Sequence, residues 1–117
     1  MTMADDIFCK IIRGEMKGEF LHRDDSVVVI RDINPHAPVH LLIVPVEHFE
    51  GVGDLTERDE GLLGHMVRVA HTVAQEQGLE KGYRLIINEG EHGGKLVPHL
   101  HMHLLGGKHL GAKLVNP

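Results

Sequence analysis

Histidine occupies three alternate positions near the end of the chain: His99, His101 and His103. Apolar residues alternate with them: Leu100, Met102 and Leu104. A period of two is the period of a β-strand, whose successive side chains point to opposite faces. We therefore predict a strand that starts near Pro98 and ends at Gly106. Its three imidazoles would share one face, spaced by about 6–7 Å.

Three kinds of chemistry fit such a row of imidazoles. The histidines could simply form a solvated strand face, although strict alternation of three makes this the least favoured interpretation. A His-x-His pair on a strand could hold zinc with a third ligand from elsewhere in the chain. Imidazole is also a nucleophile that forms covalent intermediates, and we favour its attack on phosphorus.

The elements that position this strand follow from the hydrophobic pattern. Helices are predicted over residues 5–14 and 56–78, the first ending at Gly14 and the second beginning with a Thr56–Asp59 capping box. Strands are predicted over residues 19–23, 26–32, 40–45 and 83–88. The second helix carries an apolar stripe from Leu62 to Ala74, wide enough to serve both the core and a partner chain.

Turns rich in glycine or proline separate these elements. Residues 32–35 break the second strand with turn-forming side chains. Residues 89–94 contain three glycines and precede the histidine strand. Glycine leaves backbone amides free to approach an anion, although a plain hairpin loop is the alternative.

Composition limits the classes of function. The chain has 117 residues, 42% of them hydrophobic, and a net charge of −5, which fits one globular domain over residues 1–117. It has no basic stripe, so we expect no nucleic-acid polymer as partner. Its single cysteine, Cys9, excludes an internal disulfide. We find no membrane span or signal peptide and expect a cytoplasmic protein.

The residues quoted so far resemble one family. His99 to Leu105 matches the signature of the histidine triad family, in which three alternate histidines precede two apolar residues. Further segments resemble its Hint branch, the histidine triad nucleotide-binding proteins: residues 7–12, 31–40, 82–90 and 104–107. The resemblance covers nearly the whole chain in the right order.

This resemblance implies both a fold and an activity. The fold is α+β, with a five-stranded antiparallel sheet, one long helix and one short helix, and a sheet that continues across a homodimer. The activity is hydrolysis of the P–N bond of purine nucleoside 5′-phosphoramidates to a nucleoside monophosphate and an amine. The reaction passes through a covalent nucleotidyl-histidine, and neither a cofactor nor a catalytic metal is implied. The alternatives are a nucleotide-binding regulatory module with incidental turnover and a metal-binding protein.

The resemblance also assigns catalytic roles by position. His101 corresponds to the nucleophile, with its tautomer set by the carbonyl of His99. His103 corresponds to the residue that hydrogen-bonds the phosphate and the leaving group. His40 and His99 would support the nucleophile and the proton transfers. Asp32 would accept both ribose hydroxyls.

The remaining binding residues follow in the same way. Six apolar side chains would line the purine slot: Ile7, Phe8, Ile11, Ile30, Ile33 and Leu42. Asn88 and the backbone amides of Gly94 and Val97 would hold the phosphate.

Three positions depart from the family pattern. Leu96 stands near the position where many Hint proteins carry serine, so one hydrogen bond to the phosphate or leaving group is missing. The tail, residues 108–117, lacks the tryptophan of some relatives. Some family members bind structural zinc through Cys-x-x-Cys and two histidines. Here Asp6 replaces the first cysteine, and the other three positions are Cys9, His48 and His99. The sequence leaves open whether these four residues bind structural zinc.

Overall fold

The computed structural model describes residues 5–112. Five strands form one sheet: β1 (Phe20–Arg23), β2 (Val27–Arg31), β3 (Val39–Pro45), β4 (Tyr83–Ile86) and β5 (Met102–Gly106). Their order across the sheet is β1-β2-β3-β5-β4, and all neighbours are antiparallel. This confirms the predicted α+β fold with a five-stranded antiparallel sheet.

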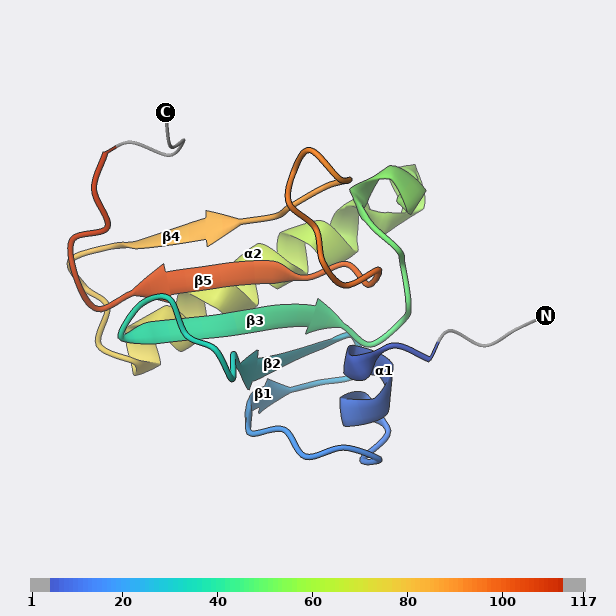
Figure 1. The fold of residues 1–117 in the computed structure, drawn as a ribbon, viewed down its shortest axis with the longest axis horizontal. Helices are drawn as coiled ribbons and strands as arrows, with labels where there is room; N and C mark the ends of the chain where they lie inside the picture. Colours follow the sequence, from blue (N-terminus) through green and yellow to red (C-terminus); the bar gives the residue numbers. More distant parts are fainter. Residues whose placement is uncertain (1–4, 113–117) are drawn as a thin grey trace.

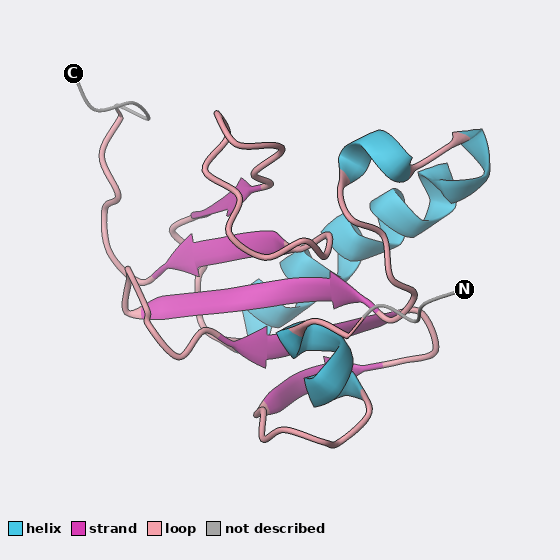
Figure 2. Ribbon diagram, turned by 45° about the vertical axis from the view of Figure 1, so that its right-hand side comes forward, coloured by secondary structure: helices cyan, strands magenta, loops and turns pink. Residues whose placement is uncertain are grey.

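Two helices cover opposite faces of this sheet. The long helix α2 (Glu60–Glu76) crosses one face, and the short helix α1 (Ile7–Ile12) packs on the other, beside β2 and β3 (Figures 1 and 2). Short 3-10 turns lie at Val52–Asp54 and Glu57–Asp59, between β3 and α2. No helix within residues 5–112 is long and apolar enough to cross a membrane.

Strand β2 shows why the central strands are continuously apolar. Val27 and Val29 pack against α2, whereas Val28 and Ile30 pack on the face that α1 covers. All four side chains are buried. A strand covered on both faces needs apolar residues at every position rather than at alternate ones.

The predicted capping residues lie at or near the ends of the two helices. The side chain of Asp6 caps α1 by accepting a hydrogen bond of 2.8 Å from the backbone N–H of Cys9, and Gly14 follows the helix with a φ of 81°. The Thr56–Asp59 capping box is present, but it begins a 3-10 turn, and α2 starts at Glu60. The Asp59 N–H donates to the Thr56 carbonyl, which is the three-residue spacing of a 3-10 turn.

The histidine strand is shorter than predicted. Strand β5 begins at Met102 instead of near Pro98, because the preceding backbone makes other hydrogen bonds. The N–H of Leu100 donates to the carbonyl of Phe49 at 2.7 Å, and that of His99 donates to Val97. The predicted apolar alternation is nevertheless confirmed, because three side chains share the α2-side core: Leu100, Met102 and Leu104.

Candidate active site

A cavity of about 340 Å³ opens on the α1 side of the sheet. It lies between α1, the turn that follows β2, the segment before β5, and β5 itself. Twelve of the fourteen predicted site residues line it: Ile7, Phe8, Ile11, Ile30, Asp32, Ile33, Leu42, Asn88, Gly94, Val97, His101 and His103. The other two, His40 and His99, lie behind the cavity wall, where each contacts one of the lining histidines.

The ring of His101 is held through one nitrogen by the backbone. Its Nδ1 atom lies 2.7 Å from the carbonyl oxygen of His99, as predicted. A carbonyl only accepts hydrogen bonds, so Nδ1 carries the hydrogen and the neutral ring keeps its lone pair on Nε2. Burial lowers the pKa of His101, and this outweighs the rise from the hydrogen bond to His99. The ring is therefore neutral at pH 7 and has a free nitrogen.

The ring of His103 is held in the opposite tautomer through His40. The backbone N–H of His36 donates to Nδ1 of His40 at 3.0 Å, so a neutral His40 carries its hydrogen on Nε2. This Nε2 lies 2.9 Å from Nδ1 of His103. The Nδ1 of His103 therefore accepts, and its Nε2–H remains as a donor.

The electrostatic environment keeps His103 and His40 neutral as well. Burial lowers the pKa of His103 to about 4, with further lowering from charge on His101 and His40. Burial also lowers the pKa of His40, although the Asp32 carboxylate, 3.4 Å away, partly offsets this effect.

Asp32 lies where β2 ends and the chain turns across the cavity. One carboxylate oxygen accepts a hydrogen bond of 2.9 Å from the backbone N–H of Asn34, which fixes the turn. The other oxygen approaches Nε2 of His40. The residue lines the cavity opposite the apolar side chains of α1, so a charged acceptor borders an apolar slot.

The glycine-containing turn before β5 supplies the polar end of the cavity. The side-chain amide of Asn88 donates to the carbonyl of Gly93 at 2.6 Å, which ties the turn to the end of β4. Gly94 has a φ of 78°, a conformation that favours glycine. Its N–H already donates to the carbonyl of Glu91 at 3.0 Å, so this amide reaches a phosphate only if that turn bond opens.

Lys95 is a cavity residue that the sequence analysis missed. Its side chain is largely buried, lines the cavity, and lies 3.7 Å from the Glu89 carboxylate. Glu89 in turn accepts hydrogen bonds from the backbone N–H groups of Val52 and Gly53. The only signal in the sequence was a cation directly after the glycines, which is consistent with anion binding but common on surfaces. Leu96 follows it and is 92% exposed at the cavity mouth.

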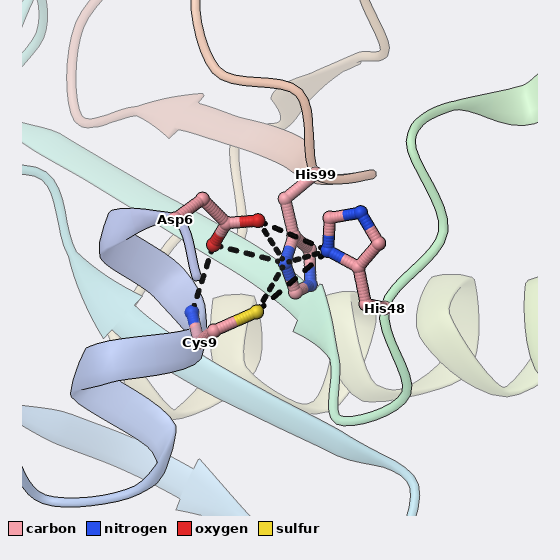
Figure 3. Close-up of side chains that lie close together, drawn as sticks. All are labelled: Asp6, Cys9, His48 and His99. Carbon is pink, nitrogen blue, oxygen red and sulfur yellow. Dashed lines mark hydrogen bonds and ion pairs between the residues drawn. The ribbon is translucent and has the colours of Figure 1, made fainter. Parts of the chain in front are cut away.

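His99 faces away from the cavity and is fully buried. Its ring meets the edge of Phe8, whose other neighbour is the ring of His101. Its Nδ1 atom lies near the side chains of Asp6, Cys9 and His48 (Figure 3). The three histidines of the motif therefore occupy two environments, and His99 contacts the candidate nucleophile only through its backbone carbonyl.

Comparisons with known proteins agree with this arrangement. Residues 5–115 match the family described as "Scavenger mRNA decapping enzyme C-term binding". A purine nucleoside phosphoramidase of Escherichia coli (strain K12) is 47% identical over 97% of this chain and 98% of its own length.

Solved structures of similar proteins share the fold over nearly the whole chain. A HIT family hydrolase from Clostridium thermocellum superimposes with a TM-score of 0.94 at 44% identity, covering 97% of this chain and all of that one. A histidine triad protein from Clostridium difficile gives a TM-score of 0.91 at 38% identity over the same shares. These matches, together with the three alternate histidines at and just before β5, show that the chain belongs to the histidine triad family.

Proposed function

We propose that this protein hydrolyses the P–N bond of purine nucleoside 5′-phosphoramidates, such as adenosine 5′-monophosphoramidate. The observation that carries the proposal is the pair of opposite tautomers in one cavity: His101 offers a lone pair, and His103 offers an N–H. A nucleophile and a hydrogen-bond donor side by side are what displacement at phosphorus requires. The similarity to a purine nucleoside phosphoramidase supports the same substrate class.

In the first step Nε2 of His101 attacks the α-phosphorus. A P–N bond to the imidazole forms while the P–N bond to the leaving amine breaks, and its electron pair goes to the departing nitrogen. That nitrogen takes up one proton from solvent, while the Nε2–H of His103 donates a hydrogen bond to the reacting group. The His99 carbonyl stabilises the positive imidazole of the intermediate through the Nδ1–H of His101.

In the second step water attacks the same phosphorus on the nucleotidyl-histidine. The bond between phosphorus and Nε2 of His101 breaks, and the electron pair returns to the ring. One proton of the water leaves to solvent, which balances the proton consumed in the first step. The products are a nucleoside monophosphate, a free amine and the original enzyme.

Substrate recognition is divided between the two ends of the cavity. Asp32 accepts the ribose hydroxyls, and the apolar side chains of α1, β2 and β3 enclose a purine. Asn88 and Val97 hold the phosphate, and the Gly94 N–H joins them once its turn bond to Glu91 opens. We add Lys95 as a cation that offsets the phosphate charge. His40 and His99 act behind the cavity wall as positioning residues.

A steady-state assay across substrate classes tests this proposal. Adenosine and guanosine phosphoramidates should be hydrolysed faster than cytidine ones, acyl-adenylates and dinucleoside polyphosphates. Binding of nucleoside monophosphates without turnover of any of these compounds would favour the regulatory-module alternative. A preference for dinucleoside polyphosphates would show that the family is right but the substrate class is wrong.

We also propose that the chain is a cytoplasmic homodimer. Among residues 5–112, strand β4 is an edge strand with one unpaired side, and the outer face of α2 exposes Val67 to 46% beside Gly64. An open strand edge and an apolar helix face on the same molecule suit pairing with a second copy. Light scattering at micromolar concentration that reports only the mass of one 13.0 kDa chain would contradict this.

A further inference from the structure

Lys95 lies on a wall between the nucleotide cavity and a neighbouring groove. Its side chain is 14% exposed and lines both the cavity, which contains His101, and the groove of about 560 Å³, which is bordered by Glu89. Burial lowers the pKa of His101, and the positive charge of Lys95 adds to this effect, so the ammonium acts on the catalytic ring. The ammonium can therefore meet an anion on either side of the wall.

On the groove side, the anion is the carboxylate of Glu89, which is held in place by the backbone. Its Oε1 accepts a hydrogen bond of 3.1 Å from the N–H of Val52, and its Oε2 accepts one of 3.0 Å from the N–H of Gly53. These two N–H groups begin the 3-10 turn Val52–Asp54 and have no acceptor within that turn. Both carboxylate oxygens therefore keep a donor when the ammonium of Lys95 moves away.

The ion pair between Lys95 and Glu89 is loose. Nζ lies 3.7 Å from Oε1, whereas an N–H···O hydrogen bond spans at most about 3.2 Å. Within residues 5–112, the ammonium makes this ion pair and no hydrogen bond. Its three N–H donors are therefore available to a ligand that offers oxygen atoms.

The loop at Gly51 packs closely against this pair. A Cβ added at Gly51 would overlap both Oε1 of Glu89 and Nζ of Lys95. The φ of Gly51 is −173°, which any residue can adopt, so close approach rather than backbone conformation favours glycine here. The loop can thus come near enough for its amides to hold the carboxylate beside Lys95.

We propose that Lys95 exchanges Glu89 for the phosphate of a bound nucleotide, and that Glu89 thereby limits the affinity for nucleoside monophosphates. The inference rests on the proposed function in placing the phosphate at this end of the cavity. Glu89 competes for the cation in the free protein, so part of the attraction between Lys95 and phosphate is spent on separating the ion pair. The nucleotide product is therefore held less tightly, whereas contacts to the nucleoside are unaffected.

Calorimetric titration of the full chain with AMP and, separately, with adenosine tests this proposal. At 0.15 M salt the Debye length is about 8 Å, so the charges of distant residues are largely screened. Glu89→Gln should tighten AMP binding by about 3- to 5-fold, the size expected from one partly exposed ion pair, and should leave adenosine binding unchanged. Lys95→Met should weaken AMP binding by about tenfold or more, again without an effect on adenosine.

Two further variants separate competition for Lys95 from a general change of charge. Glu91→Gln removes an exposed carboxylate from the same turn and the same groove, and it should leave AMP affinity within about 1.5-fold of the wild type. In the Lys95→Met background, Glu89→Gln should also change AMP affinity by less than about 1.5-fold, because the competition acts through Lys95. Equal tightening in either case would overturn the proposal, as would weaker or unchanged AMP binding by Glu89→Gln alone.

The wild type offers a readout that needs no substitution at Glu89. In protein with ¹⁵N-labelled lysine, the ammonium signal that is missing from Lys95→Met should shift with AMP and stay in place with adenosine. A Lys95 signal that does not respond to AMP would overturn the proposal even if the Glu89 variants fail to fold. None of these measurements involves turnover, so an absence of phosphoramidate hydrolysis would refute the proposed function without refuting the exchange at Lys95.

Discussion

The imidazole rings of His101 and His103 lie 5.1 Å apart and are held in opposite tautomers. The backbone carbonyl of His99 holds the hydrogen of His101 on Nδ1, and His40 directs that of His103 to Nε2. Two identical side chains thus acquire different roles from groups outside the cavity. Exchanging their roles would require both supporting contacts to change, so we expect neither histidine to replace the other.

Removing the nucleophile should separate binding from turnover. His101→Ala should lose at least about 10³-fold in kcat, because no other lone pair is held toward the phosphorus. It should still bind AMP within a few-fold of the wild type, since the apolar slot and Asp32 remain. Rapid quench with radiolabelled substrate followed by peptide mapping should place an acid-labile label on His101 of the wild type. Label on His99 or His103 would refute the assignment, and His103→Ala should be impaired less severely.

The acid side of the pH profile should reflect the lowered pKa of His101. Only the neutral ring attacks, and burial favours that form, so the attacking species persists below the ordinary histidine value of 6.5. The acid limb of kcat/KM should therefore have its midpoint below pH 6.5. Measurement from pH 4 to 8 in buffers of constant ionic strength checks this. A midpoint at or above 6.5 would mean that burial does not lower the pKa of His101.

The alternating histidines predict which neighbouring side chains are buried, but they do not predict where strand β5 begins. Alternation correctly buries Leu100 and Met102, and the position of Pro98 suggests a strand start. The backbone of Leu100 instead bonds to the loop that contains Phe49, which is a contact between segments far apart in the chain. No local pattern reports such a contact, so the departure of His99 from the cavity face was not predictable.

The same limit explains why Lys95 was missed and Asp32 was found. Asp32 follows a strongly β-branched strand, where the residue pattern predicts only a turn, and the family motif that runs through it assigned it to the site. Lys95 enters the cavity because Glu89 anchors the turn to the loop at Val52 and Gly53. That anchor spans separate elements and leaves no spacing rule in the sequence.

Asp32 should control discrimination between ribose and deoxyribose. A missing partner for a charged acceptor costs about 1.5–3 kcal/mol, so the wild type should prefer ribonucleotide substrates by about 10- to 150-fold in kcat/KM. Asp32→Ala should flatten this ratio. Asp32→Asn is the matched control for the turn, because its amide oxygen still accepts from the Asn34 N–H. An unchanged ratio in Asp32→Ala would remove this residue from the ribose site.

Leu96 should limit the rate with small amine leaving groups. Its side chain lines the cavity mouth near the segment that we propose holds the phosphate, where it offers no hydrogen bond. Leu96→Ser should raise kcat by about 2- to 10-fold, which corresponds to one neutral hydrogen bond in the transition state. Leu96→Ala is the control for lost bulk and should not show this increase. Equal gains in both variants would assign the effect to steric access instead.

Asp24 should contribute to stability without affecting catalysis. Its Oδ1 accepts from the backbone N–H groups of Ser26 and Val27 at 2.7 and 2.8 Å, which closes the turn between β1 and β2. Its Oδ2 lies 2.7 Å from His22 and 2.8 Å from His65, so it also connects the hairpin to α2. Burial raises the pKa of Asp24, but the hydrogen bonds from His22 and the backbone outweigh it and leave the pKa below 3.8.

Asp24→Ala should therefore lower the free energy of unfolding by about 1–2 kcal/mol, the usual cost of losing a carboxylate that caps backbone amides. Urea denaturation at pH 7 measures this, with the exposed Asp25→Ala as a control expected within about 0.5 kcal/mol of the wild type. Because the folded pKa is depressed, the contribution is present above the unfolded value of 3.8 and is lost as the pH falls through the folded pKa. The difference in unfolding free energy between wild type and Asp24→Ala should thus stay constant from pH 7 to 5, because Asp24 remains ionised over that range. Disappearance of this difference within that range would contradict the stabilising role assigned to the Asp24 carboxylate.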